Sequence, residues 1–246
     1  MHRFYPDPEK SRDDLVFLTP EDSRHALTVL RLKPGARVEV ISGGLPWLAE
    51  IAGEEGRTVC VRKLTPLSST EPKLAVTLFQ GIPKADKMDW IIQKATELGV
   101  NRIVPVEMER CVVRLSRADG EKKLERWRKI CREAGKQSGR CVLPEILPPM
   151  TIRQLIMLDF LPALNVVPWE EAGGFGPLAL HKAHPGAESL GILIGPEGGI
   201  SPEEIVLLKT RDFIPITLGK RILRTETAGM AAVAALMCLY GEMEKE

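Results

Sequence analysis

The sequence predicts an α/β protein in which a small β-rich domain precedes a larger domain built on a mostly parallel sheet. Short strand-like segments separated by turns fill the first quarter of the 246-residue chain, whereas strand-like and helix-like segments alternate through the rest. Between them, residues 65–72 are rich in Pro, Ser and Thr and show no periodicity, which is typical of a linker. We therefore expect domains over residues 1–68 and 73–246.

Composition places the chain among ordinary soluble globular proteins. Hydrophobic residues make up 44% and charged residues 27%. No apolar run reaches membrane-spanning length, and the opening MHRFYPDPEK lacks the apolar core of a signal peptide. The five cysteines are odd in number and never spaced C-x-x-C, which predicts reduced thiols in a cytoplasm. The four histidines are dispersed, so we expect no metal site.

The first domain should contain one helix and several strands. The segment TPEDSRHALTVL reads as a helix with Thr19 as N-cap, Pro20 at the first helical position and Asp22 two residues later. The run LVFL before it is a short apolar strand. After it come three strand-like segments, ARVEVIS, PWLAEIAG and RTVCVRKL, separated by turns that contain glycine.

The second domain should alternate strand and helix. Apolar runs predict strands over residues 73–80, 102–106, 163–169, 189–195 and 213–219. Helical spacing predicts helices over residues 84–99, 119–137 and 201–211, and an Ala-rich helix from residue 228 onward. This alternation favours parallel strands, and ligands of such sheets bind at the carboxyl ends of the strands.

One such strand end carries a glycine-rich turn. The strand of ILIGPEGGISPEE runs directly into Gly195–Gly199, and Ser201–Glu204 then forms a capping box with proline at the first helical position. Three glycines in five residues allow a tight turn and close approach of a ligand to the backbone. Glu197 would repel phosphate and suits a ligand with hydroxyl or amine donors, or a cation. The alternative is a turn that merely connects strand and helix.

A second strand end carries two arginines that local structure does not explain. In LGKRILRTETAGM, Thr225 or Thr227 can cap the last helix, and Glu226 suits its positive end. Arg221 and Arg224 do not, because positive charge is unfavourable at a helix N-terminus. They are better explained by an anion such as a phosphate, a carboxylate or a developing oxyanion. Neither G-x-G-x-x-G after a strand nor a P-loop is present, which disfavours a standard nucleotide site.

Positive charge is concentrated in the segment from residue 110 to residue 140, although the net charge of the whole chain is only +1. A solvated helix face is one explanation, and a surface that binds a nucleic-acid backbone is the other. The first domain adds basic residues near a turn, so it is a plausible RNA platform. The residues that we expect to contact RNA are Arg24, Arg31, Lys33, Arg110, Arg114, Lys122, Lys123, Arg126, Arg128, Lys136 and Arg140.

Five motifs in order resemble one family. GIPKADKMDWIIQKATELGV, ERCVVRL, EAGKQSGR, IGPEGGISPEE and LGKRILRTETA together resemble the RsmE family of SPOUT methyltransferases, which methylate N3 of a uridine in 16S ribosomal RNA. HRFY and HALTVLRLKPG resemble the PUA-like RNA-binding β-barrel of that family. The resemblance implies a SPOUT domain with a trefoil knot, S-adenosyl-L-methionine as cofactor, a homodimer with active sites at its interface, and 16S rRNA or the small ribosomal subunit as partner.

The resemblance also implies that the segment NVVPWEE, residues 165–171, lines the cofactor pocket, and it implies roles for individual residues. The implied cofactor pocket is Gly195, Glu197, Gly198, Leu218, Gly219, Ile222, Leu223, Arg224, Glu226, Thr227 and Ala228. Arg224 and Arg3 are the candidate catalytic residues, because a nearby guanidinium would favour the uracil anion. Glu226 could act as a base, but capping or cofactor binding suits it better. The alternatives are a SPOUT enzyme with another RNA target and a non-catalytic RNA-binding or ribosome assembly factor.

Overall fold

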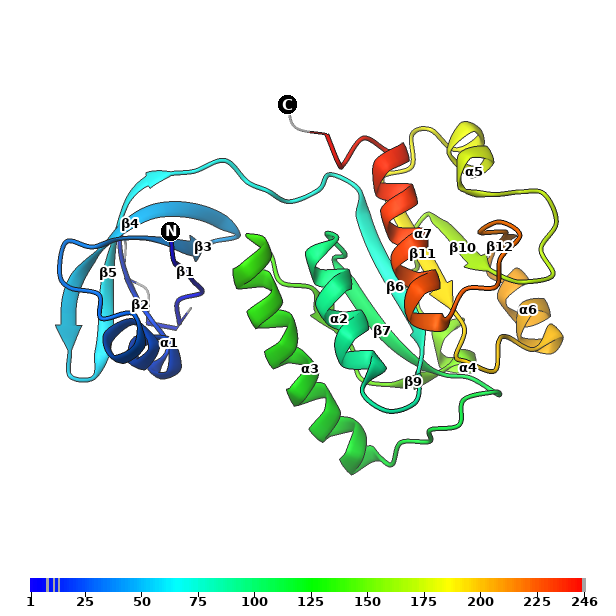
Figure 1. The fold of residues 1–246 in the computed structure, drawn as a ribbon, viewed down its shortest axis with the longest axis horizontal. Helices are drawn as coiled ribbons and strands as arrows, with labels where there is room; N and C mark the ends of the chain where they lie inside the picture. The colour runs from blue at the N-terminus through cyan, green and yellow to red at the C-terminus, as the bar shows by residue number, and fades with distance from the viewer. Residues whose placement is uncertain (8, 11, 13, 245–246) are drawn as a thin grey trace. The chain divides into compact units, whose positions relative to one another are not determined.

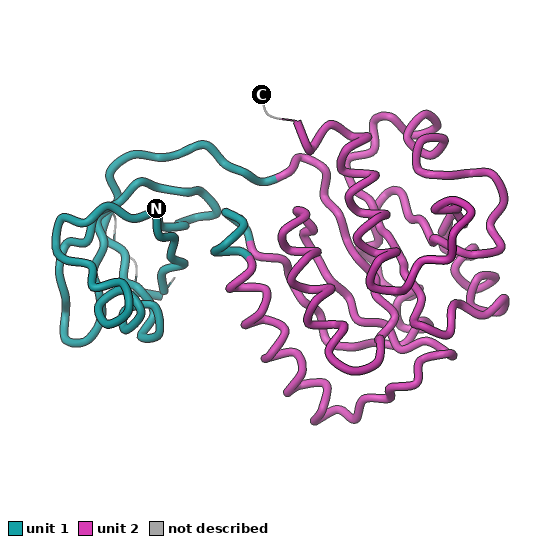
Figure 2. The backbone as a smooth tube through the Cα atoms, viewed as in Figure 1, with its two compact units in different colours: residues 1–71, 135–142 teal, residues 72–134, 143–246 magenta. Residues whose placement is uncertain are grey.

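The computed structural model describes residues 1–7, 9, 10, 12 and 14–244 and divides the chain into two compact units (Figure 1 and Figure 2). The first unit comprises residues 1–71 together with residues 135–142, and the second comprises residues 72–134 and 143–246. The contribution of residues 135–142 to the first unit is not visible in the sequence, because that segment continues a long helix.

The first unit is built on a five-stranded sheet in the order β1-β3-β4-β5-β2. Its strands are β1 (Arg3–Phe4), β2 (Leu15–Phe17), β3 (Arg37–Ser42), β4 (Leu45–Glu55) and β5 (Thr58–Pro66). Strands β3, β4 and β5 pair antiparallel and are joined by two-residue turns. The first turn has both residues, Gly43 and Gly44, at positive φ (61° and 73°), which matches the twist of a tight hairpin. The three strand-like segments of the sequence are thereby confirmed.

The helix of the first unit begins as predicted but changes its winding. Helix α1 (Pro20–Arg24) has Thr19 as N-cap, and the Thr19 hydroxyl accepts a hydrogen bond from the Asp22 N–H at 3.2 Å. The same helical segment continues as a π-helical turn, η1 (His25–Val29), which the sequence pattern did not predict.

A buried ion pair joins residues 135–142 to the rest of the first unit. The Glu71 carboxylate accepts hydrogen bonds from the Arg140 guanidinium (2.7 and 3.0 Å) and from the Cys141 N–H (2.6 Å). The Arg140 carbonyl in turn accepts from the Tyr5 hydroxyl at 2.9 Å. Burial alone would raise the pKa of Glu71, but these donors outweigh it and hold the pKa below its ordinary value.

Two residues predicted as RNA contacts therefore have structural contacts within the first unit. Arg140 is only 3% exposed, because its guanidinium compensates the Glu71 carboxylate. Lys136 lies 2.7 Å from the carboxylate of Asp22, which is 2% exposed. A buried carboxylate requires a cation beside it, so both positive charges are used inside the protein.

The second unit contains a seven-stranded sheet whose pairs are all parallel, as the alternation of elements predicted. The strand order is β12-β10-β11-β6-β7-β8, and β9 also pairs with β7. The bounds are β6 (Ala75–Gly81), β7 (Arg102–Glu107), β8 (Glu145–Ile146), β9 (Met150–Thr151), β10 (Leu164–Pro168), β11 (Ser189–Ile194) and β12 (Phe213–Ile216).

Helices cover both faces of this sheet. They are α2 (Lys87–Glu97), α3 (Arg117–Ser138), α4 (Ile152–Leu155), α5 (Pro177–Ala183), α6 (Pro202–Lys209) and α7 (Thr225–Leu239), of which α4 and α5 were not predicted. Helices α2 and α7 lie side by side on one face (Figure 1). Along β11, Ile192 belongs to the core on one face and Leu193 to the core on the other, which explains why the strand is apolar throughout.

Among the residues that the structure describes, no helix combines the length and the apolar character needed to cross a membrane.

The strand order fixes the path of the last loop. The chain passes from β11 through α6 to β12, which lies at the sheet edge beyond β10. It then returns to α7, which packs against β11 and β6. Residues 217–224 must therefore run back over the carboxyl ends of the intervening strands. This return path brings the loops after β10, β11 and β12 together.

The Glu71–Arg140 pair leads to a prediction about stability. Glu71→Gln removes the charge opposite a buried guanidinium, so we expect the first unit to lose about 3 kcal/mol of unfolding free energy at pH 7. Because the folded-state pKa of Glu71 is lowered, its contribution is complete above the ordinary value of 4.5 and disappears as the pH falls through the folded-state pKa.

Guanidinium denaturation of the wild type and the variant at pH 7 and at acidic pH measures both effects. The exposed Glu54→Gln is the matched control and should be neutral. A Glu71→Gln variant as stable as the wild type at pH 7 would contradict the prediction.

Candidate functional site

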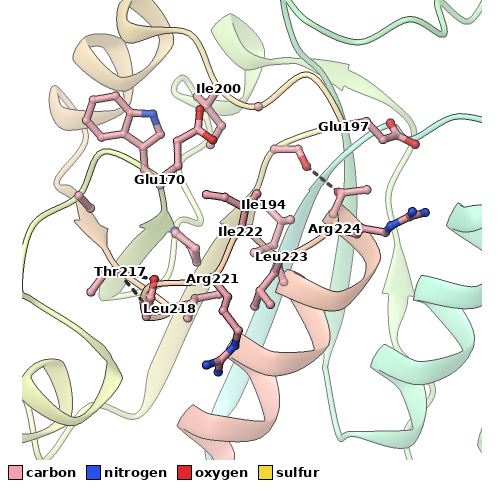
Figure 3. A pocket seen from close by; sticks show the side chains of 18 of the residues that line it. Glu170, Ile194, Glu197, Ile200, Thr217, Leu218, Arg221, Ile222, Leu223 and Arg224 are labelled. Atoms are coloured by element: carbon pink, nitrogen blue, oxygen red, sulfur yellow. Dashed lines mark hydrogen bonds between the residues drawn. The ribbon is translucent and has the colours of Figure 1, made fainter.

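The loops that follow three neighbouring strands line one cavity of about 870 Å³ (Figure 3). The lining residues are Pro168, Trp169, Glu170, Ala172 and Gly174 after β10, Ile194–Ile200 around the end of β11, Thr217–Arg224 after β12, Thr225 and Ala228 of α7, and Lys87 of α2. The glycine turn and the arginine-bearing loop that sequence analysis singled out thus face the same space, at the carboxyl edge of the sheet.

The glycine turn packs backbone against backbone. A methyl group built on Gly81, the last residue of β6, would lie 2.6 Å from the Pro196 nitrogen, so no side chain fits there. Gly199 has φ of +74°, which favours glycine. The capping box is confirmed: the Ser201 hydroxyl accepts from the Glu204 N–H (3.3 Å), and the Glu204 carboxylate accepts from the Ser201 N–H (3.2 Å).

The loop after β7 braces the glycine turn from one side. The Glu109 N–H donates to the Glu204 carboxylate at 2.8 Å, and the Ser201 hydroxyl donates to the Glu109 carboxylate at 2.7 Å. Arg110 Nη1 donates to the Gly198 carbonyl at 3.2 Å. Arg110, which was predicted to contact RNA, therefore contacts the wall of the cavity.

Lys87 braces the turn from the other side. Its Nζ lies 2.9 Å from the Glu197 carboxylate and 3.3 Å from the Glu226 carboxylate, and Glu197 also accepts from the Lys84 N–H at 3.1 Å. Burial alone would raise the pKa of Glu197, but these hydrogen bonds hold it below its ordinary value. The hydrogen bond to Glu197 is the main cause that raises the pKa of Lys87. The donors that the sequence suggested for a ligand of Glu197 are therefore supplied by the protein.

The start of α7 differs from the predicted cap. Arg224 is the N-cap residue, and its side chain makes no capping hydrogen bond. Thr225 is already helical, and its buried hydroxyl donates to the Gly195 carbonyl at 2.6 Å and accepts from Gln80 Nε2 at 2.9 Å. Neither Thr225 nor Thr227 caps the helix, because the first hydroxyl is held by these two partners and the second is exposed beyond the cap position.

Most of the implied cofactor residues line the cavity. They are Gly195, Glu197, Gly198, Leu218, Gly219, Ile222, Leu223, Arg224 and Ala228, whereas Glu226 and Thr227 are not among the lining residues. Arg224 is exposed and has no ionic partner among the described residues. Arg3 lies in the first unit, where its guanidinium contacts the Glu39 carboxylate at 2.6 Å.

Three further residues shape this site. Trp169 and Glu170 line the cavity, as the resemblance implied for residues 165–171. Lys87 belongs to the motif GIPKADKMDWIIQKATELGV, but no contact was predicted for it, because its partners Glu197 and Glu226 are remote in sequence. Only the helix-opening position of Lys87 could have suggested a role near a strand end.

The remaining predicted RNA contacts divide by their partners. Arg126 binds the Asp89 carboxylate, and Arg114 donates to the Glu109 carbonyl at 3.0 Å. Lys122 and Arg128 on α3 are exposed, Lys123 is half-buried, and Arg24, Arg31 and Lys33 are exposed in the first unit. In the part of the chain that the structure describes, no group of three or more His, Cys, Asp or Glu is placed to hold a metal ion.

Comparison with known proteins identifies the family. Residues 70–237 match an RNA methyltransferase domain, and residues 18–64 match an RNA methyltransferase PUA domain. The chain is 35% identical over 227 residues to ribosomal RNA small subunit methyltransferase E of Bacillus subtilis, covering 89% of this chain and 88% of that one. The chain belongs to this family. A ribosomal RNA small subunit methyltransferase E from Aquifex aeolicus is 31% identical, with 96% and 99% covered.

A solved structure agrees with this family assignment. The ribosomal RNA small subunit methyltransferase E of Neisseria gonorrhoeae, bound to S-adenosyl methionine, superposes with a TM-score of 0.85 at 34% identity, covering 99% of this chain and all of that one. In the present chain, residues 70–237, which match the RNA methyltransferase domain, include every loop that lines the cavity. The family and the fold class predicted from the motifs are thus confirmed.

The Lys87 contacts give a testable expectation. Lys87→Met removes the donor that contributes most to lowering the pKa of Glu197. Burial, which raises that pKa, then acts with less opposition, so we expect the pKa of Glu197 to rise. Carbon-13 NMR titration of the glutamate carboxyls measures it. Lys94→Met is the matched control, because Lys94 pairs with Glu97 at 2.8 Å on the same helix. An unchanged Glu197 pKa in Lys87→Met would refute the assignment of Lys87 as its partner.

Proposed function

We propose that this protein methylates N3 of a uridine in small-subunit ribosomal RNA, with S-adenosylmethionine as the methyl donor. The observation that carries the proposal is the cavity that the glycine turn and the arginine-bearing loop line together. The relative from Neisseria gonorrhoeae, whose structure holds S-adenosyl methionine, supports the cofactor, and the relatives' shared name, ribosomal RNA small subunit methyltransferase E, supports the RNA target.

The cavity fits this cofactor by size and by lining. Its volume of about 870 Å³ falls within the usual range for small-molecule sites. Exposed backbone at the glycine turn offers hydrogen bonds, and apolar walls suit an adenine ring. The residues that would hold the cofactor are Gly195, Gly198, Leu218, Gly219, Ile222, Leu223 and Ala228. When bound, S-adenosylmethionine supplies a methyl group already activated by its sulfonium.

Arg224 is the residue we assign to the uracil. N3 of uracil carries a proton, so it becomes a nucleophile only when the negative charge left on its oxygens is stabilised. Arg224 lines the cavity, has no carboxylate partner among the described residues and stands at the positive end of α7. Its guanidinium can therefore favour the uracil anion.

Glu226 and Arg3 are less suited to a catalytic role than Arg224. Glu226 pairs with Lys87 and does not line the cavity, so we give it no role as a base. Arg3 contacts Glu39 and the Arg140 carbonyl, which leaves its guanidinium committed within the first unit. The chain must also align the base with the methyl group, and a stacked uridine must leave its stack to reach the cavity.

Removing the Arg224 guanidinium tests the mechanism. We expect Arg224→Ala to slow methyl transfer by about 100-fold or more, because one donor to a developing oxyanion contributes on the order of 3 kcal/mol. Transfer to small-subunit RNA from a strain lacking the enzyme, followed by mass analysis for 3-methyluridine, gives rate and product together.

The control is Arg153→Ala on the surface of α4, which should leave the rate unchanged. Near-normal turnover by Arg224→Ala would remove Arg224 from the mechanism. A methyl group found on another nucleoside would overturn the uridine target while leaving the cofactor site intact.

We further propose that the RNA backbone is bound by those predicted RNA contacts whose side chains are exposed and have neither a hydrogen-bond nor an ion-pair partner among the described residues. In the second unit these are Lys122 and Arg128, and in the first unit Arg24, Arg31 and Lys33. Lys122→Ala combined with Arg128→Ala should weaken RNA binding and lower the slope of log affinity against log salt by about 1.5. Fluorescence anisotropy at several salt concentrations measures the slope. Lys182→Ala, exposed on α5, is the control, and an unchanged slope in the double variant would leave α3 as a solvated face.

The proposal extends to a cytoplasmic homodimer with the trefoil knot of SPOUT enzymes. The return of residues 217–224 over neighbouring strand ends is compatible with such a knot. Helix α7 has small residues at helical spacing: Ala231 and Ala234 are partly exposed, and Cys238 is exposed. Small side chains on one helix face suit close packing against a second copy. All five cysteines are free thiols, as expected in a reducing compartment.

A further inference from the structure

Glu170 presents a carboxylate to the cavity that the protein itself does not use. It follows β10 and lies beside the glycine turn, near Ile200, in Figure 3. A methyl group built on Gly199 would be 3.6 Å from Glu170 Oε1, so the carboxylate reaches the backbone of the turn. Within the described residues, Glu170 forms neither a hydrogen bond nor an ion pair.

No basic residue around the cavity forms an ion pair with Glu170 in the part of the chain that the structure describes. Glu197, the second carboxylate of the lining, already accepts from Lys84 and Lys87. Arg110 comes close to Gly199, but its Nη1 donates to the Gly198 carbonyl. Arg221 and Arg224 point away from Glu170 in Figure 3. An ionised carboxylate only accepts hydrogen bonds, so Glu170 is suited to a ligand that brings donors.

We infer that Glu170 binds the vicinal ribose hydroxyls of the cofactor; this inference rests on the proposed function. Arg224, assigned to the uracil, lies on the opposite side of the cavity from Glu170 in Figure 3. The methyl group must face the uracil, so Glu170 faces the nucleoside half of the cofactor. Two carboxylate oxygens match two adjacent hydroxyl donors, and acidic residues bind ribose hydroxyls in the same way in dinucleotide-binding folds.

The neighbouring residue provides a matched control. Glu171 has the same side chain and is also exposed, but it does not line the cavity. Glu170→Gln and Glu171→Gln therefore remove the same charge from adjacent positions, and only the first removes it from the cavity. Circular dichroism of both variants verifies that they fold.

Isothermal titration calorimetry with S-adenosylhomocysteine and its 2′-deoxy and 3′-deoxy analogues tests the inference. We expect Glu170→Gln to bind S-adenosylhomocysteine about 10-fold more weakly than the wild type, since hydrogen bonds to a charged group contribute strongly. The wild type should bind the deoxy analogues more weakly than the parent ligand, whereas Glu170→Gln should discriminate little between them. Glu171→Gln should behave as the wild type.

Three outcomes would overturn the inference alone. They are wild-type affinity of Glu170→Gln for S-adenosylhomocysteine, an equal loss for the parent and deoxy ligands, and a loss confined to the cationic S-adenosylmethionine. The last would place the carboxylate against the sulfonium. If the wild type bound neither S-adenosylmethionine nor S-adenosylhomocysteine, the proposed function would fail and the inference with it.

Discussion

The second unit depends on a buried hydroxyl that ties three chain segments together. Thr225 at the start of α7 donates to the Gly195 carbonyl at the end of β11 and accepts from Gln80 at the end of β6. Thr225 is 5% exposed and Gln80 is fully buried, so the Thr225 hydroxyl and the Gln80 amide nitrogen are removed from water and depend on this hydrogen bond. Because Gly195 opens one wall of the cavity and Thr225 follows the other, this junction fixes the distance between the two walls.

The charged residues around the cavity divide into scaffold and ligand groups. Lys87 on one side, and Glu109 with Arg110 on the other, hold the glycine turn through contacts within the protein. These groups shape the site before any ligand arrives, which lowers the cost of ordering it on binding. Glu170, Lys220, Arg221 and Arg224 line the cavity without an ionic partner in the part of the chain that the structure describes, and they are available to meet a ligand.

The same division applies to the basic segment that suggested RNA binding. Charge counted along the sequence treats all its residues alike, yet Lys136 and Arg140 compensate the carboxylates of Asp22 and Glu71 within the first unit. A buried carboxylate without a cation would be costly, so these positions serve stability. Charge density in a sequence therefore gives an upper limit on the number of residues available to a nucleic acid.

The sequence by itself determined the parallel α/β class, the strands longer than two residues, the caps at Thr19 and Ser201, and the strand ends that carry the site. These features follow from hydrophobic periodicity and from contacts within a few residues, which are local. Only the tertiary structure decided that Lys87 meets Glu197, that Arg140 pairs with Glu71, and that the Thr225 hydroxyl joins Gly195 to Gln80. Such pairings join residues distant in the chain. They are set by strand order and by the path of the return loop, which no local pattern encodes.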